Sequence, residues 1–370
     1  MRESTVYLDH NATTPLCNAA REAMSAALAE TGNPSSVHGF GRAARARMEA
    51  ARRDVASLVD ARNADVWFTS GGTEANALAV AGVGRTRILV SAIEHDSILA
   101  QAPDEARIPV DQSGVVDLAA LARMLDASDD PVLVSVMWAN NETGVVQPIA
   151  EVVSLAHARG GLVHCDAIQA AGRLPVSFAE TGLDLMSVSA HKLGGPAGIG
   201  ALIARKGLAL TPLIKGGGQE QGRRSGTENL IGIAGFGAAA KTAEQSRSLW
   251  QTVARLRDGL ERKIQETAQT ARVMGGEAVR LANTSCITMP GVAAETQVMA
   301  LDLAGFAVSA GSACSSGKVK RSHVLDAMEP DGEAAETAIR ISLGLDTTEE
   351  EIDRLVDAWL ELYKRSSRTS

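Results

Sequence analysis

Short apolar runs alternate with helix-like stretches between about residues 65 and 235. The runs that predict buried strands are Asp65–Thr69, Arg87–Ala92, Val132–Met137, Leu162–Cys165 and Leu185–Val188. Helical patterns lie between them, for example Thr73–Ala81, Asp117–Leu125 and Ile149–Ala158. Strands and helices that alternate in this way predict an α/β fold with a mostly parallel sheet covered on both faces. Ligands of such sheets bind at the carboxyl ends of the strands.

A long helical stretch, Thr227–Thr267, follows, and the pattern then changes. Strands are expected at Ser285–Met289, Phe306–Ser309 and Ala338–Ser342, with helices at Glu295–Leu303 and Thr348–Tyr363. This pattern predicts a smaller α+β domain. The expected division is a large domain of residues 16–250 and a small one of residues 1–15 and 251–370. The strand Val6–Asp9 and the helix Cys17–Glu30 are both candidates to pack with the small domain.

Composition excludes several classes of partner. The chain has 370 residues, and 36 Lys and Arg against 44 Asp and Glu give a net charge of −8, so no overall basic field attracts nucleic acid or a membrane surface. The helix Arg42–Val59 is rich in arginine, but Glu49 and Asp54 interrupt the run, which favours a solvated or subunit-facing helix. No apolar run reaches the ~18–20 residues of a membrane span. We therefore expect a cytoplasmic protein with small-molecule partners.

The cysteines Cys17, Cys165, Cys286 and Cys314 are far apart and show no metal-ligand spacing, which predicts neither a metal site nor a disulfide framework. Cys314 differs from the others because its neighbours from Ser309 to Gly317 are all small. Such a composition is typical of an exposed loop, whereas Cys286 lies in an apolar stretch and fits a buried structural role.

A lysine with unusual neighbours follows the strand Leu185–Val188. In Ser189-Ala190-His191-Lys192-Leu193-Gly194-Gly195-Pro196, Lys192 is flanked by a hydroxyl, an imidazole and glycines. Desolvation at a strand end keeps an amine from full protonation, as a Schiff-base lysine requires. An isolated loop lysine is more often structural, so the assignment depends on further groups at the same edge.

Three other strand ends carry such groups. Ser70-Gly71-Gly72-Thr73-Glu74 joins a strand to a helix and predicts a phosphate cup, because its backbone N–H groups point along a helix N-terminus. Asp166 directly follows the strand Leu162–Cys165 and could pair with a protonated pyridine nitrogen, and Gln169 lies one helical turn later. His95 also follows a strand, although a lone histidine is more often structural. Together these groups favour a pyridoxal phosphate site.

With these residues identified, the chain resembles the cysteine desulfurases of the class V aminotransferase family, of the type that supplies sulfur for iron–sulfur clusters or nitrogenase. The resemblance runs over nearly the whole chain. It rests on the segments Tyr7–Pro15, Gly32–His38, Val136–Gly144, Arg223–Asn229 and the small-residue segment around Cys314. It implies a pyridoxal-phosphate-dependent transferase of fold type I, with a seven-stranded sheet in the large domain.

The resemblance also implies roles for individual residues. Lys192 is expected to be the Schiff-base lysine, His95 to stack on the ring and carry protons, and Asp166 to pair with the pyridine nitrogen. Arg340 is expected to bind the substrate carboxylate, and Thr227 to complete the phosphate site of the other subunit in a homodimer. Further contacts to the phosphate, the ring or the substrate are expected from Asn11, Gly72, Thr73, Asn141, Gln169, Ser189 and His191.

Cys314 is the expected sulfur acceptor. The resemblance implies that its thiolate attacks the sulfur of the substrate L-cysteine, leaves a persulfide on Cys314 and releases L-alanine. The sulfur then passes to an acceptor or iron–sulfur scaffold protein, and Cys314 is a candidate for a transient cluster ligand. Two alternatives stay open: a selenocysteine lyase or another β-eliminating enzyme of the same fold, and a non-catalytic sulfur carrier.

Overall fold

The computed structural model describes residues 5–311, 321–330 and 332–366. The strands are β1 (Val6–Tyr7), β2 (Asp65–Thr69), β3 (Arg87–Ser91), β4 (Arg107–Ile108), β5 (Val132–Ser135), β6 (Leu162–Asp166), β7 (Leu185–Ser189), β8 (Gly200–Ala204), β9 (Thr284–Thr288), β10 (Phe306–Ala307), β11 (Ser309–Ala310) and β12 (Ala338–Ser342). The helices are α1 (Asn18–Leu28), α2 (Gly39–Leu58), α3 (Gly72–Gly82), α4 (Asp96–Leu99), α5 (Leu118–Asp126), α6 (Ile149–His157), α7 (Phe178–Thr181), α8 (Leu230–Gln245), α9 (Trp250–Thr267), α10 (Ala294–Leu303), α11 (His323–Met328), α12 (Ala334–Thr337) and α13 (Glu349–Ser366).

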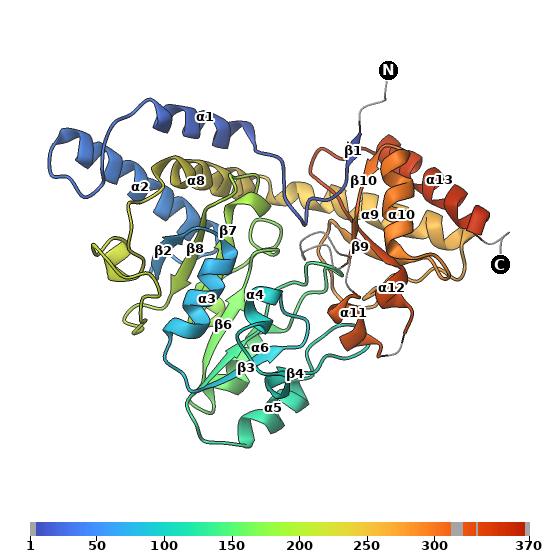
Figure 1. The fold of residues 1–370 in the computed structure, drawn as a ribbon, viewed down its shortest axis with the longest axis horizontal. Coiled ribbons are helices and arrows are strands. Elements are labelled where there is room, and N and C mark those ends of the chain that lie inside the picture. The colour runs from blue at the N-terminus through green and yellow to red at the C-terminus, as the bar shows by residue number, and fades with distance from the viewer. Residues whose placement is uncertain (1–4, 312–320, 331, 367–370) are drawn as a thin grey trace.

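A seven-stranded sheet in the order β2-β8-β7-β6-β5-β3-β4 forms the larger part of the molecule (Figure 1). Only β8 in this sheet runs antiparallel to its neighbours β2 and β7, so the predicted mostly parallel α/β sheet is confirmed. The short apolar run that forms β8 was not predicted from the sequence. Its antiparallel course places Gly200 beside both Thr69 and Ser189, at the ends of β2 and β7.

Both faces of this sheet are buried, because helices cover the apolar strand side chains on each side. Val66 and Phe68 of β2 belong to an apolar cluster that includes residues of α2, α5, α6 and α8, whereas Trp67 between them belongs to a cluster with residues of α3 and α4. Successive strand side chains point to opposite faces, which is why these strands carry near-continuous apolar runs. The helices on both faces keep the strand ends, and the loops that follow them, in fixed positions.

The C-terminal part is built on the antiparallel sheet β11-β12-β9, packed with α9, α10 and α13 around a second apolar core. The N-terminal β1 pairs with β10 of this part. The helix α1 does not pack there, because it lies along α8 (Figure 1). We propose the division into residues 16–250 and residues 1–15 with 251–370, which these separate cores support.

Two predicted elements differ in detail from the structure. The stretch Thr227–Thr267 is not one helix, because α8 ends at Gln245 and α9 begins at Trp250. The predicted strand Phe306–Ser309 is divided into β10 and β11, which belong to different sheets. Short-range apolar patterns do not record which partner a strand takes.

Phe236 of α8 offers a test of the main core. It is fully buried, and its ring centroid lies 6.3 Å from that of Phe68. Phe236→Ala should lower the free energy of unfolding by ~3–5 kcal/mol, because it leaves a cavity that the helices cannot close. Phe40→Ala makes the same change at a side chain that is 69% exposed, and it should stay within ~0.5 kcal/mol of the parent. Denaturant unfolding followed by circular dichroism measures both, and equal losses would contradict this packing.

Candidate active site

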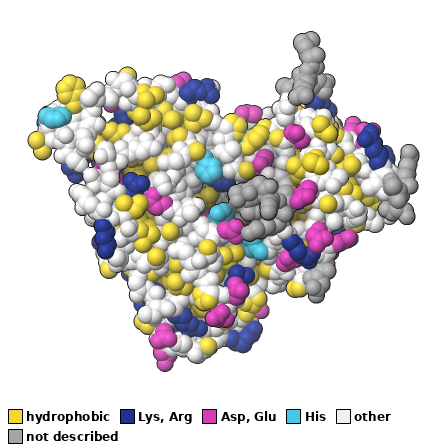
Figure 2. Space-filling view, in the orientation of Figure 1, with side chains coloured by type: hydrophobic (Ala, Val, Ile, Leu, Met, Phe, Trp, Pro, Cys, Tyr) yellow, Lys and Arg dark blue, Asp and Glu magenta, His cyan; other side chains and the backbone are white. Residues whose placement is uncertain are grey.

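The loops after β2, β3, β5, β6 and β7 surround one cavity of about 380 Å³ at the carboxyl edge of the sheet. In the space-filling view, histidine side chains gather near the middle of the face shown (Figure 2). Most of the site residues predicted from the sequence line this cavity: Asn11, Gly72, Thr73, His95, Asn141, Asp166, Gln169, Ser189, His191 and Lys192. Segments far apart in the chain thus supply one site.

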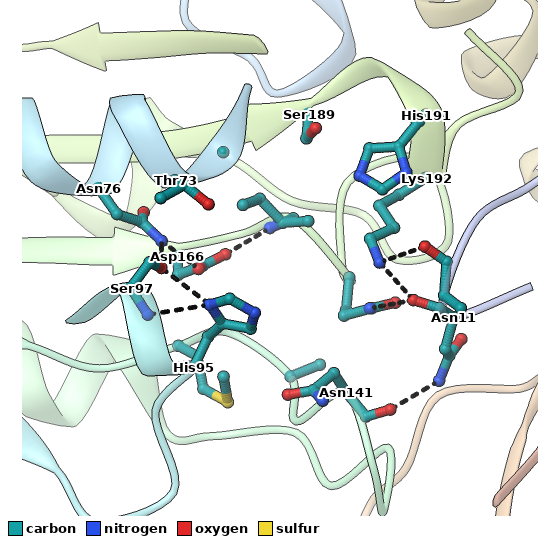
Figure 3. A pocket seen from close by; sticks show the side chains of 16 residues that line it. Asn11, Thr73, Asn76, His95, Ser97, Asn141, Asp166, Ser189, His191 and Lys192 are labelled. Carbon is teal, nitrogen blue, oxygen red and sulfur yellow. Dashed lines mark hydrogen bonds between the residues drawn. The ribbon is translucent and has the colours of Figure 1, made fainter. Parts of the chain in front are cut away.

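The amine of Lys192 lies against the N-terminal segment of the chain (Figure 3). Its Nζ donates to the carbonyl oxygens of Asn11 at 2.5 Å and of Ala12 at 2.7 Å. The carbonyl of Asn11 also accepts from the side-chain amide of Gln169 at 2.9 Å. The backbone that places Lys192 is a 3-10 turn, Ala190–Lys192, that begins directly after β7.

Asp166 lies at the end of β6 and is almost fully buried. Its carboxylate accepts from the Ile168 N–H at 3.0 Å and from the Asn76 amide at 2.7 Å. Burial raises the pKa of Asp166, while these two donors, followed by the charges of His95 and Lys192, oppose the rise. The carboxylate is therefore arranged to pair with a cation inside the cavity.

Glu94, next to His95, is a second buried acid near the site. Burial and the charge of Asp166 raise the pKa of Glu94 well above its usual value. One of its oxygens accepts the Met137 N–H at 2.6 Å, which ties the loop after β3 to the loop after β5. Because a second carboxylate charge so close to Asp166 is unfavourable, the arrangement favours a neutral Glu94 and an ionised Asp166.

The opposite end of the cavity is lined by small and hydroxyl-bearing residues. Thr73 lies in the first turn of α3, and Gly72 is packed so closely that a Cβ there would lie 2.2 Å from Cδ1 of Ile168. The hydroxyl of Ser189 is buried without a hydrogen-bond partner among the described residues. Burial, followed by the charges of Lys192 and Arg173, lowers the pKa of His191 to about 4. Hydroxyls beside a helix N-terminus fit an anion such as a phosphate.

Arg173, which the sequence analysis did not identify, connects several segments of the chain beside the site. It is buried and donates to carbonyl oxygens of His10 at 3.2 Å, Gln169 at 3.1 Å and Lys192 at 3.4 Å. Burial, followed by the charge of Arg340, lowers the pKa of Arg173 to about 10. The guanidinium thus joins three segments of the site.

Asn76 and Ser97 also line the cavity and were not predicted from the sequence either, although Asn76 follows Gly72 by one helical turn.

Two predicted site residues that the structure describes, Arg340 and Thr227, do not line the cavity. Arg340 is 1% exposed and bonds to Asp9 at 2.7 Å and to the carbonyl of Asn141 at 3.0 Å, while its Nε has no partner among the described residues. Thr227 lines a separate hollow of about 260 Å³ beside Ser70 and Gly198. Cys314 lies outside the described residues.

The residues that flank the Cys314 segment, Gly311 and Ser322, meet at a single buried carboxylate. Ser322 donates to Oε2 of Glu142 at 2.6 Å, and a Cβ on Gly311 would lie 2.6 Å from the same oxygen. Glu142 follows Asn141, which lines the cavity. The described residues on both sides of the Cys314 segment therefore lie close to the site.

Comparisons with known proteins agree with this geometry. The model of the class-V aminotransferase family matches residues 6–355. The chain belongs to the cysteine desulfurase family of class-V aminotransferases. A cysteine desulfurase of Cereibacter sphaeroides is 46% identical, with 95% of this chain and 94% of that protein covered. An IscS-like cysteine desulfurase of Mycobacterium tuberculosis is 39% identical, with 98% of each chain covered.

Solved structures show the same family and fold. The NifS-like protein from Rickettsia africae has a TM-score of 0.90 at 36% identity, covering 97% of this chain and 99% of its own. A protein described as SspA in complex with cysteine has a TM-score of 0.77 at 28% identity, covering 92% and 99%. Among the described residues, no helix is both long and apolar enough to cross a membrane.

A substitution at Gly200 tests how the cup, Ser70–Glu74, is held in place. A Cβ at Gly200 would lie 2.7 Å from the carbonyl carbon of Gly71 and 2.9 Å from the Val188 oxygen, both backbone atoms. Gly200→Ala should displace the cup and weaken binding of pyridoxal phosphate about tenfold, since overpacking costs ~1–3 kcal/mol. Gly259→Ala in α9, where nothing lies within 4 Å of the added carbon, should leave binding unchanged. Absorbance titration of the cofactor-free protein measures both, and equal affinities in the two variants would contradict the account.

Proposed function

We propose that the chain is a pyridoxal-phosphate-dependent cysteine desulfurase that converts L-cysteine to L-alanine and leaves the sulfur as a persulfide on Cys314. The observation that carries the proposal is the arrangement of Lys192, Asp166 and the hydroxyl-lined cup around one cavity. The cysteine desulfurases among its relatives, matched over nearly their full length, support the choice of reaction.

The cavity fits pyridoxal phosphate by the chemistry of its lining. The unpartnered, buried hydroxyl of Ser189 lies at the phosphate end, where a polar ligand group would satisfy it. Gly72 lets the cup pack against Ile168, where a Cβ would clash, and Thr73 adds a second hydroxyl. Asp166 would hold the ring nitrogen in its protonated form, and Lys192 would bond to the aldehyde carbon. When bound, pyridoxal phosphate supplies an electron sink for the bonds at the substrate α-carbon.

The chain's own residues then bind and orient the substrate and move its protons. His95 lies on the wall of the cavity, where a flat ring can stack on it and a proton can be exchanged. Gln169 and Asn141 line the cavity and would supply amide groups to the ring hydroxyl and the substrate, and Asn11 lies beside Lys192. Arg340, held by Asp9, serves the substrate carboxylate, because a guanidinium presents two parallel donors to it.

Sulfur transfer needs a nucleophile that the described residues do not supply. The thiolate of Cys314 forms an S–S bond with the substrate sulfur while the C–S bond breaks, and a proton is added at the β-carbon. A thiol and cysteine thus become a persulfide and alanine, with atoms and electrons balanced. The described residues on either side of Cys314 support this role, because Gly311 and Ser322 both lie at Glu142, the residue after Asn141.

The proposal extends to the assembly and its partners. Thr227 lies apart from the main cavity, in the hollow beside Ser70, which supports a homodimer in which Thr227 completes the phosphate site of the other copy. The persulfide sulfur passes to an acceptor or scaffold protein for iron–sulfur cluster assembly, with Cys314 as a transient ligand at most. We place the protein in the cytoplasm, as its composition suggests.

The reaction is tested by the products from L-cysteine in the presence of a reductant. The intact protein should release alanine and sulfide in equal amounts, and Cys314→Ala and Lys192→Ala should each lower the rate by about 10³-fold, since each removes a reacting group. Cys17→Ala removes a thiol that does not line the cavity and should keep full activity.

The outcome that overturns this assignment is alanine formed at the parental rate by Cys314→Ala. The thiol would then not be the sulfur acceptor, and a lyase acting on selenocysteine would replace the desulfurase. Absence of both products in the intact, cofactor-loaded protein would leave the non-catalytic sulfur carrier.

A further inference from the structure

His95 both precedes and caps the short helix α4. Its ring nitrogen Nδ1 accepts the backbone N–H of Ser97 at 3.1 Å and lies 2.9 Å from the hydroxyl oxygen of the same residue. A backbone N–H can only donate, so Nδ1 must present its lone pair to Ser97. A proton on Nδ1 would set two donors against each other and break this cap.

The hydroxyl of Ser97 is oriented by a second residue, Asn76. The amide nitrogen of Asn76 lies 2.9 Å from the Ser97 hydroxyl and 2.7 Å from the Asp166 carboxylate. An ionised carboxylate accepts only, so the nitrogen of this fully buried amide, rather than its oxygen, faces Asp166. The Ser97 oxygen therefore accepts from Asn76, and its own proton is available for Nδ1 of His95.

We infer that Asn76 and Ser97 are positioning residues that fix His95 as the neutral tautomer with its proton on Nε2. The inference rests on the proposed function in one respect, the ionised state of Asp166. Figure 3 shows the second ring nitrogen of His95 on the side away from Ser97, toward the cavity. His95 thus meets the substrate as a proton donor, and the proton at the substrate α-carbon is left for Lys192 to accept.

These hydrogen bonds also link Asp166, which would hold the ring nitrogen, to His95, which would stack on the ring. Asp166, Asn76, Ser97 and His95 are joined by hydrogen bonds of 2.7, 2.9 and 2.9 Å. Because the Asn76 amide donates to both neighbours, the carboxylate that would hold the ring nitrogen also fixes the orientation of the hydroxyl that fixes His95. Neither Asn76 nor Ser97 needs to contact the reacting atoms for this effect.

The tautomer can be read directly by ¹⁵N NMR of the holoenzyme labelled at histidine, with the His95 signals assigned by their loss in His95→Gln. The expected spectrum shows an unprotonated Nδ1 and a protonated Nε2 at the pH of the activity assay. A proton on Nδ1, or a doubly protonated ring, would overturn the inference. The NMR result does not depend on sulfide release, so it stands or fails separately from the proposed function.

Ser97→Ala removes the hydroxyl but keeps the backbone N–H. It should shift the Nδ1 signal of His95 and lower kcat about fivefold with KM unchanged, because one of two hydrogen bonds that fix the tautomer is lost. Ser97→Thr, which restores a hydroxyl, should recover both. Ser25→Ala, on the exposed face of α1, is the matched control and should change neither. An unshifted Nδ1 signal in Ser97→Ala would contradict the role given to this hydroxyl.

Discussion

The site depends on the segment from Asp9 to Thr14, which crosses the carboxyl edge of the sheet. Asn11 is its centre: its carbonyl accepts from Lys192 and Gln169, and its side chain bonds to the carbonyl of Asn141 and to the hydroxyl of Thr284. Thr284 begins β9 of the C-terminal part. A single buried residue therefore sets the lysine, the cofactor cavity and the second apolar core relative to one another.

Burial makes the charges at this edge interdependent. Asp166, Glu94 and Arg173 are all removed from water, where an unpaired charge is costly. Each is compensated differently: Asp166 by amide donors and the charge of Lys192, Arg173 by carbonyl oxygens, and Glu94 by a raised pKa that favours its neutral form. A ligand with a cationic ring nitrogen and an anionic phosphate complements this arrangement at both ends, which explains why acid, lysine and hydroxyls occur together.

The sequence was most informative where local patterns and chemistry coincide. The limits of β2 and β12 were predicted at both ends, and the strand ends led to Lys192, Asp166, His95 and the cup after β2. The family resemblance supplied what spacing alone could not, such as Gln169 and Asn141 in the same cavity. Arg173, Asn76 and Ser97 were missed because their roles arise from hydrogen bonds between segments, which no local periodicity records. The course of α1 and the division of Phe306–Ser309 were missed for the same reason.

The central claim is that Lys192 carries the cofactor at the edge set by Asn11. The most direct measurement is to load the protein with pyridoxal phosphate, reduce the adduct with borohydride, and locate the modified residue by peptide mass mapping. The account predicts one modified residue per chain, Lys192, and almost none when the loaded protein is first treated with a competing amine. Modification of another lysine, or of several lysines to similar extents, would contradict it.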